Sequence, residues 1–169
     1  MRVGRAKKEP PIELFRDPPR GMILSEGAGA ALLAREGGVE IDVIDAGGNF
    51  LRRHEARKVV GQVLHRLAAE DACIVASANG TFVDLAERAA IEKELPPAGV
   101  YSPKAALGES VGASAMWQVI AAAQALRTRR FPDVSPPGGG RKAGAISFTR
   151  AIVLSCGLNQ QVAGLRLSN

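Results

Sequence analysis

The chain has 169 residues, of which 46% are hydrophobic and 23% are charged, which excludes a fibrous or a disordered protein. Only 4% of the residues are aromatic, so the core must consist of Ala, Val, Ile and Leu. The 19 glycines allow neighbouring backbone segments to approach closely, as in α/β packing. The 22 Lys and Arg residues exceed the 17 Asp and Glu residues, which favours an acidic partner such as a carrier protein, a phospholipid or a nucleic acid.

The first predicted elements follow a proline-rich, extended lead-in at residues 1–20. Residues 39–45 alternate between apolar and polar side chains, as in a strand. Residues 53–70 place apolar side chains at steps of three and four, which predicts an amphipathic helix with its charged face outward. Residues 72–77 are apolar throughout up to their terminal serine, which predicts a buried strand.

The second half of the chain continues the alternation of helices and strands. We expect a helix from Thr81 or Asp84 to about Glu94, a short strand at 100–101, a helix at 112–127, a flexible connection at 132–144, and a hairpin of strands at 151–156 and 161–167. The helix at 112–127 is so rich in small apolar residues that most of its circumference should be buried between layers. This order predicts the α/β class, with a mixed β-sheet covered by helices on both faces.

Several function classes are excluded by the pattern of residues. The two cysteines, Cys73 and Cys156, lie in apolar stretches and have no partner at zinc spacing, so we expect neither a disulfide framework nor a metal site. The glycines at 27 and 29 superficially match a dinucleotide fingerprint, but Leu32 occupies the third glycine position, so we expect no cofactor.

Membranes and nucleic acids are also disfavoured as partners. No signal peptide or spanning apolar run is visible, which predicts a cytoplasmic protein without a membrane partner. The small basic groups lack interleaved aromatic residues, so we expect no nucleic-acid partner.

Four short motifs stand in a fixed order along the chain: RGMILSEGAGA at 20–30, NGT at 79–81 followed by Asp84 and Glu87, SPKAALGESVGASA at 102–115, and SCGLN at 155–159. In order and spacing this series resembles the C-terminal half of the β-ketoacyl-[acyl carrier protein] synthases, which are condensing enzymes with the thiolase fold. The resemblance covers residues 15–167. It implies a thiolase-like half at 21–169 and a role in fatty acid or polyketide-type biosynthesis.

The resemblance also implies which positions would hold the catalytic groups. In that family a cysteine of the first half accepts the acyl chain, and two histidines of the second half assist decarboxylation and stabilise the enolate or thioester oxygen. The first histidine falls at Asn79 if the Gly-Thr pair is aligned, or near Ala76 if Asp84 and Glu87 are aligned instead. Either alignment removes the imidazole.

The second histidine position falls at Glu109, whose negative carboxylate would repel an enolate. Lys104 matches the family lysine and is expected either to support the active-site loops or to pair with Glu109. No intact catalytic group is therefore expected in this chain.

Other residues receive structural interpretations or pocket roles. Thr81, Gly157, Leu158 and Asn159 are candidates for a substrate pocket, although Leu158-Asn159 replaces the Phe-Gly of the family. Cys156 is expected to be a buried small side chain rather than a nucleophile. The only histidines, His54 and His65, are interpreted as surface or satisfied helix residues.

Two functions remain open at this point. The first is a degenerate half-synthase, an acyltransferase only in a complex with a partner that resembles the first half and supplies the cysteine. The alternative is a non-catalytic accessory subunit, comparable to a chain-length factor, that docks an acidic acyl carrier protein. The first function predicts that the Ala-rich face of 112–126 meets a partner or a second copy.

Overall fold

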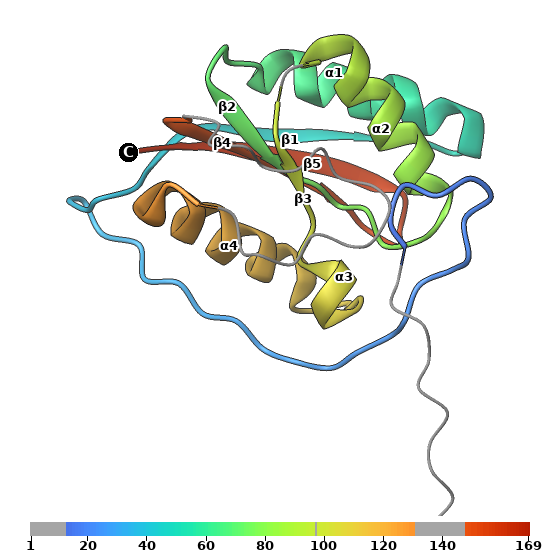
Figure 1. Cartoon of the computed structure of the whole chain (residues 1–169), viewed down its shortest axis with the longest axis horizontal. Coiled ribbons are helices and arrows are strands. Elements are labelled where there is room, and N and C mark those ends of the chain that lie inside the picture. Colours follow the sequence, from blue (N-terminus) through green and yellow to red (C-terminus); the bar gives the residue numbers. More distant parts are fainter. Residues whose placement is uncertain (1–12, 97, 131–147) are drawn as a thin grey trace, which may run out of the picture.

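The computed structural model describes residues 13–96, 98–130 and 148–169. It contains one five-stranded sheet with the strand order β1-β5-β4-β2-β3 (Figure 1). The strands are β1 (Glu40–Asn49), β2 (Ala72–Val75), β3 (Val100–Tyr101), β4 (Arg150–Cys156) and β5 (Gln161–Ser168). Strand β2 is parallel to both β3 and β4, whereas β5 is antiparallel to β4 and β1, so the sheet is mixed as predicted.

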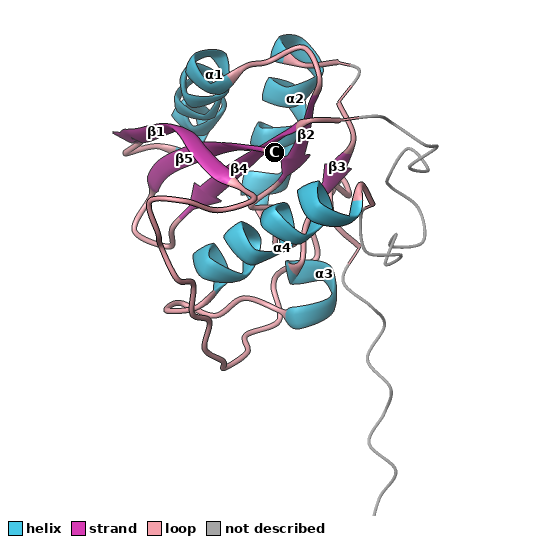
Figure 2. Cartoon of the chain, turned by 90° about the vertical axis from the view of Figure 1, so that its left-hand side faces the viewer, coloured by secondary structure: helices cyan, strands magenta, loops and turns pink. Residues whose placement is uncertain are grey.

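Helices cover both faces of this sheet. They are α1 (Ala56–Leu67), which a short 3-10 turn at Arg53–Glu55 precedes, α2 (Phe82–Glu94), α3 (Lys104–Leu107) and α4 (Ser114–Thr128). Figure 2 shows α1 and α2 on one side of the sheet and α3 and α4 on the other. The predicted two-sided covering is therefore confirmed. Among the described residues, no helix has the length and apolarity that crossing a membrane requires.

Alternation along the central strands creates two separate cores. Ile152, Leu154 and Cys156 of β4 point to the core under α1 and α2, while Ala151 and Val153 point to the core under α4. This period of two is the pleat of a strand that is buried on both faces. Both cores consist mainly of aliphatic side chains, with Phe50 in the first and Phe148 in the second, in agreement with the low aromatic content of the chain.

One helix boundary and one additional helix differ from the sequence-based expectation. Helix α1 ends at Leu67 rather than near Glu70, because Ala68 has a ψ of 140° and leaves the helical region. The single turn α3 was not predicted, because four residues are too few to display a helical period.

Helix α4 is exposed only at Ala115, Gln124, Arg127 and Thr128, so most of its circumference is at least partly covered, as predicted. Its buried residues are Ser114, Gln118, Ala122, Ala125 and Leu126. The Gln118 amide donates to the carbonyl oxygens of Ala76, at 2.8 Å, and Leu154, at 2.5 Å. This side chain fixes α4 to the two parallel strands near their carboxyl ends.

The outer side of α4 faces an extended segment, residues 22–36, drawn in blue in Figure 1. A Cβ added at Gly27 would lie 2.3 Å from the Trp117 ring, and one at Gly29 would lie 2.8 Å from Met116, so both glycines permit a close approach. Gly108 is also tightly packed, whereas a Cβ added at Gly112 would meet nothing within 4 Å. The segment leaves Leu24, Leu32 and Leu33 exposed by 67%, 94% and 78%.

Candidate functional site

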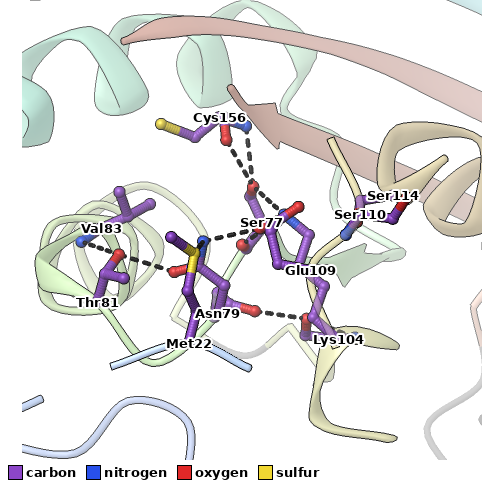
Figure 3. Close-up of polar contacts among 12 residues, drawn as sticks. Met22, Ser77, Asn79, Thr81, Val83, Lys104, Glu109, Ser110, Ser114 and Cys156 are labelled. Carbon is purple, nitrogen blue, oxygen red and sulfur yellow. Dashed lines mark hydrogen bonds and ion pairs between the residues drawn. The ribbon is translucent and has the colours of Figure 1, made fainter. Parts of the chain in front are cut away.

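The candidate site lies where the three parallel strands end at one edge of the sheet. The chain continues from β2 into the buried loop 76–80, from β3 into residues 102–109, and β4 ends at Cys156. Since parallel strands present their carboxyl ends at the same edge, the fold brings these three segments together. Figure 3 shows the polar side chains that meet there.

A buried ion pair forms the centre of the site. The Lys104 ammonium lies 2.8 Å from Oε2 of Glu109, and the two side chains are 2% and 6% exposed. Lys104 also donates to the carbonyl oxygen and to the hydroxyl of Ser77, both at 3.1 Å. All three ammonium donors therefore have acceptors. The expected pairing of Lys104 with Glu109 is confirmed.

The two positions that the resemblance assigns to histidines contact each other. The Asn79 amide donates to Oε2 of Glu109 at 2.7 Å, and Asn79 is 3% exposed (Figure 3). The Thr81 hydroxyl donates to Oδ1 of Asn79 at 2.7 Å and accepts from the backbone N–H of Val83 at 3.4 Å, as the N-cap of α2. The alternative position, Ala76, places its methyl group in the core under α1 and α2.

Ser77 joins the three strand ends, a role that the sequence did not predict. Its hydroxyl accepts from Lys104 and from the backbone N–H of Cys156 at 2.9 Å, and its own N–H donates to Oε1 of Glu87 at 2.7 Å. A polar residue directly after a fully apolar strand was the available signal. That signal could not indicate which partners the serine would have.

Two carboxylates on α2 hold the loop before that helix. Asp84 accepts the backbone N–H groups of Asn79 and Gly80, and also that of Phe15 from the N-terminal segment. Glu87 is 1% exposed, and its second oxygen, Oε2, has no hydrogen-bond partner among the described residues. Burial raises the pKa of Glu87 to about 8, with a further increase from the charge of Asp84.

The chemistry open to this network is limited by the residue types. The Asn79 amide can donate a hydrogen bond but cannot transfer a proton, and the donor it contributes is directed at Glu109. The Glu109 carboxylate is occupied by Lys104 and Asn79. Lys104 and Asn79 both bind Oε2 of Glu109, so the three side chains connect the loop 76–80 to residues 102–109 in the interior.

The remaining pocket candidates lie apart from this network. Gly157, Leu158 and Asn159 form the β4–β5 turn, where the Gly157 N–H donates to the carbonyl oxygen of Gln161 at 2.8 Å. Leu158 is 51% exposed. Their assignment to a substrate pocket stays a prediction.

Both cysteines are buried, and burial raises the pKa of each thiol to about 12. Because the thiolate is the reactive form, we expect both thiols of the native protein to react with a disulfide reagent at least about tenfold more slowly than in denaturant. Labelling at neutral pH, with and without urea, measures this. Rapid labelling of one thiol in the native protein would contradict the structural role of Cys156.

The histidines lie away from the site, on the outer side of α1. His65 is 78% exposed and lies 3.1 Å from Oε2 of Glu94, in agreement with a surface role. In the part of the chain that the structure describes, no group of three His, Cys, Asp or Glu side chains could hold a metal ion.

Comparison with family models and with curated proteins finds no match. Solved structures do match. The ketosynthase from module 1 of the bacillaene synthase of Bacillus amyloliquefaciens FZB42 has a TM-score of 0.63 at 19% identity, over 95% of this chain and 37% of its own. The ishigamide ketosynthase/chain length factor has a TM-score of 0.59 at 18% identity, over 97% of this chain and 48% of its own.

A third match is an oxazolomycin ketosynthase domain from Streptomyces albus JA3453, with a TM-score of 0.53 at 23% identity, over 78% of this chain and 42% of its own. These similarities establish that the chain has the thiolase-like ketosynthase fold, as the motifs predicted. The chain spans less than half the length of each of these three structures.

Proposed function

We propose that this chain is a non-catalytic, ketosynthase-like accessory subunit of polyketide-type biosynthesis. The observation that carries this proposal is the contact between the two replaced histidine positions, in which Asn79 donates to Glu109 at 2.7 Å. In an active condensing enzyme, the imidazole groups of the two histidines would face the substrate. Here the amide and the carboxylate face each other and Lys104, so they hold loops together.

The proposal includes a protein partner. The exposed Leu24, Leu32 and Leu33 lie on the extended segment 22–36, and a row of large aliphatic side chains in solvent is typical of an interaction surface. This differs from the sequence-based expectation, which placed the partner surface on α4. The partner proposed is a ketosynthase-like chain that supplies the cysteine nucleophile, and an acyl carrier protein is the proposed donor of the acyl groups.

The proposal is tested by measuring the decarboxylation activity of the assembled complex. The chain is co-expressed with a ketosynthase-like protein that carries an active-site cysteine, and release of CO2 from a malonyl-loaded carrier protein is measured. We expect the complex with Asn79→Ala to retain activity within about twofold, because an accessory subunit contributes no acid or base. Glu92→Ala is the control for expression and assembly of a variant, since the Glu92 side chain is 66% exposed on α2.

A second candidate function is the degenerate half-synthase. It is favoured by the extent of the structural similarity, which covers 95% and 97% of this chain in the two ketosynthase structures named first. In that case the Asn79 amide would act as a hydrogen-bond donor to substrate, and Asn79→Ala would lower turnover by about 100-fold or more without affecting assembly. That result would overturn the accessory role.

A further inference from the structure

A groove runs between α1 and α2, on the side of the sheet opposite to α4. It has a volume of about 630 Å³, within the usual range for small-molecule sites. Its lining from α1 and the turn before it follows the helical repeat: His54, Arg57, Lys58, Gly61, Gln62, His65 and Arg66. Ala90, Lys93 and Glu94 of α2 complete the opposite wall.

The lining is strongly positive. Four permanent cations face one carboxylate, so the groove carries three formal positive charges even with both histidines neutral. Helix α1 itself contains no Asp or Glu. An ordinary solvated helix face carries charges of both signs, so this composition calls for a specific explanation.

Part of this charge is already neutralised inside the protein. Arg66 forms two hydrogen bonds to Asp45, at 2.5 Å and 3.2 Å. Lys93 and His65 both contact Glu94, at 2.7 Å and 3.1 Å. These three basic groups are therefore engaged at one end of the groove.

The basic groups at the other end are not engaged. Among residues 13–96, 98–130 and 148–169, the side chains of His54, Arg57 and Lys58 have no hydrogen bond or ion pair. The carboxylate of Glu55 is influenced by the charges of His54 and Lys58, but its Oε2 accepts the backbone N–H groups of Leu51 and Arg52. Arg57 and Lys58 also lie in the first turn of α1, where positive charge is unfavourable for a helix.

Gly61 keeps the groove open. It stands in the interior of α1, where glycine is a poor helix former, and a Cβ added there would meet nothing within 4 Å. Neither packing nor backbone conformation therefore requires glycine at this position. A side chain there would fill space between the two helices.

We propose that this groove binds a compact, multiply charged anion of the phosphate type, held by Arg57 and Lys58 with His54 beside them. Three unengaged basic groups within five residues fit a small anion better than an extended acidic surface, and no Phe, Tyr or Trp side chain lines the groove to stack on a base. Guanidinium and ammonium groups are the usual ligands of phosphate oxygens. This site is independent of the proposed accessory role.

The test is calorimetric titration of the full chain with inorganic diphosphate at low salt. We expect saturable binding that the double variant Arg57→Gln/Lys58→Gln weakens by about tenfold or more. Gly61→Leu should weaken binding by a similar factor without any change in charge, while helix propensity keeps the variant folded. Arg127→Gln/Arg130→Gln, which removes two exposed cations from the end of α4, is the matched control and should change affinity by less than about twofold.

Three results would overturn the proposal. One is the absence of saturable diphosphate binding up to about 10 mM. Another is equal weakening by the groove variant and by the α4 control, which would indicate a general charge effect. The third is tighter binding of hexaglutamate than of diphosphate through Arg57 and Lys58, which would assign the groove to an acidic protein surface.

Discussion

Replacing Lys104 by methionine is expected to lower the free energy of unfolding by about 3–5 kcal/mol. The substitution removes the ammonium and leaves the Glu109 carboxylate in the interior, where only the Asn79 amide still donates to it. An unpaired buried charge is among the most destabilising changes that one substitution can make. Urea denaturation followed by the fluorescence of the single tryptophan measures the loss.

A double variant separates the contribution of the ion pair to stability from the cost of leaving one buried charge without a partner. Lys104→Met/Glu109→Gln removes both charges and should recover most of the lost stability, because no uncompensated ion remains. Lys93→Met is the surface control. Lys93 pairs with Glu94 at 2.7 Å but is 71% exposed, so the urea midpoint of the Lys93→Met variant should be close to that of the unaltered protein. A Lys104→Met variant within about 1 kcal/mol of the unaltered protein would contradict the buried pair.

Replacing Glu87 by glutamine is expected to remove a large pH dependence of stability. Burial raises the pKa of Glu87 from 4.5 to about 8, so the folded protein holds a proton that the unfolded chain releases above pH 4.5. Stability from this group therefore falls as pH rises from about 4.5 to 8 and is constant outside that window. The total effect is about 5 kcal/mol, from 1.36 kcal/mol for each pKa unit.

The glutamine variant keeps the shape of the neutral acid and cannot ionise. Its stability relative to the unaltered protein should be similar near pH 4.5 and should rise steadily toward pH 8, measured by urea denaturation across this range. Glu92→Gln is the control, because the Glu92 side chain is on the same helix but 66% exposed. Parallel pH profiles of the Glu87→Gln variant and the unaltered protein would show that Glu87 is ionised in the folded state.

Most elements of the fold were predictable because their signals are local. The apolar steps of three and four at 53–70 follow from the buried stripe of α1, and the alternation at 39–45 follows from β1. The hairpin of β4 and β5 follows from a four-residue connection between two apolar runs. Helix ends and single helical turns were less predictable. The end of α1 depends on one ψ angle, and α3 has only four residues.

The candidate site was only partly predictable. The pairing of Lys104 with Glu109 was expected because five positions separate them, and the structure places them 2.8 Å apart. The contact between Asn79 and Glu109 joins residues that lie 30 positions apart, and Ser77 meets Cys156 across 79 positions. No local pattern encodes such contacts.

The sequence by itself determined which segments form helices and strands and which motifs follow one another. The tertiary structure alone decided that Asn79 and Glu109 bind each other in the interior, because only the parallel arrangement of β2, β3 and β4 brings their carboxyl ends to one edge. It also decided that the basic residues of α1 line a groove, since their common surface exists only where α2 packs beside α1.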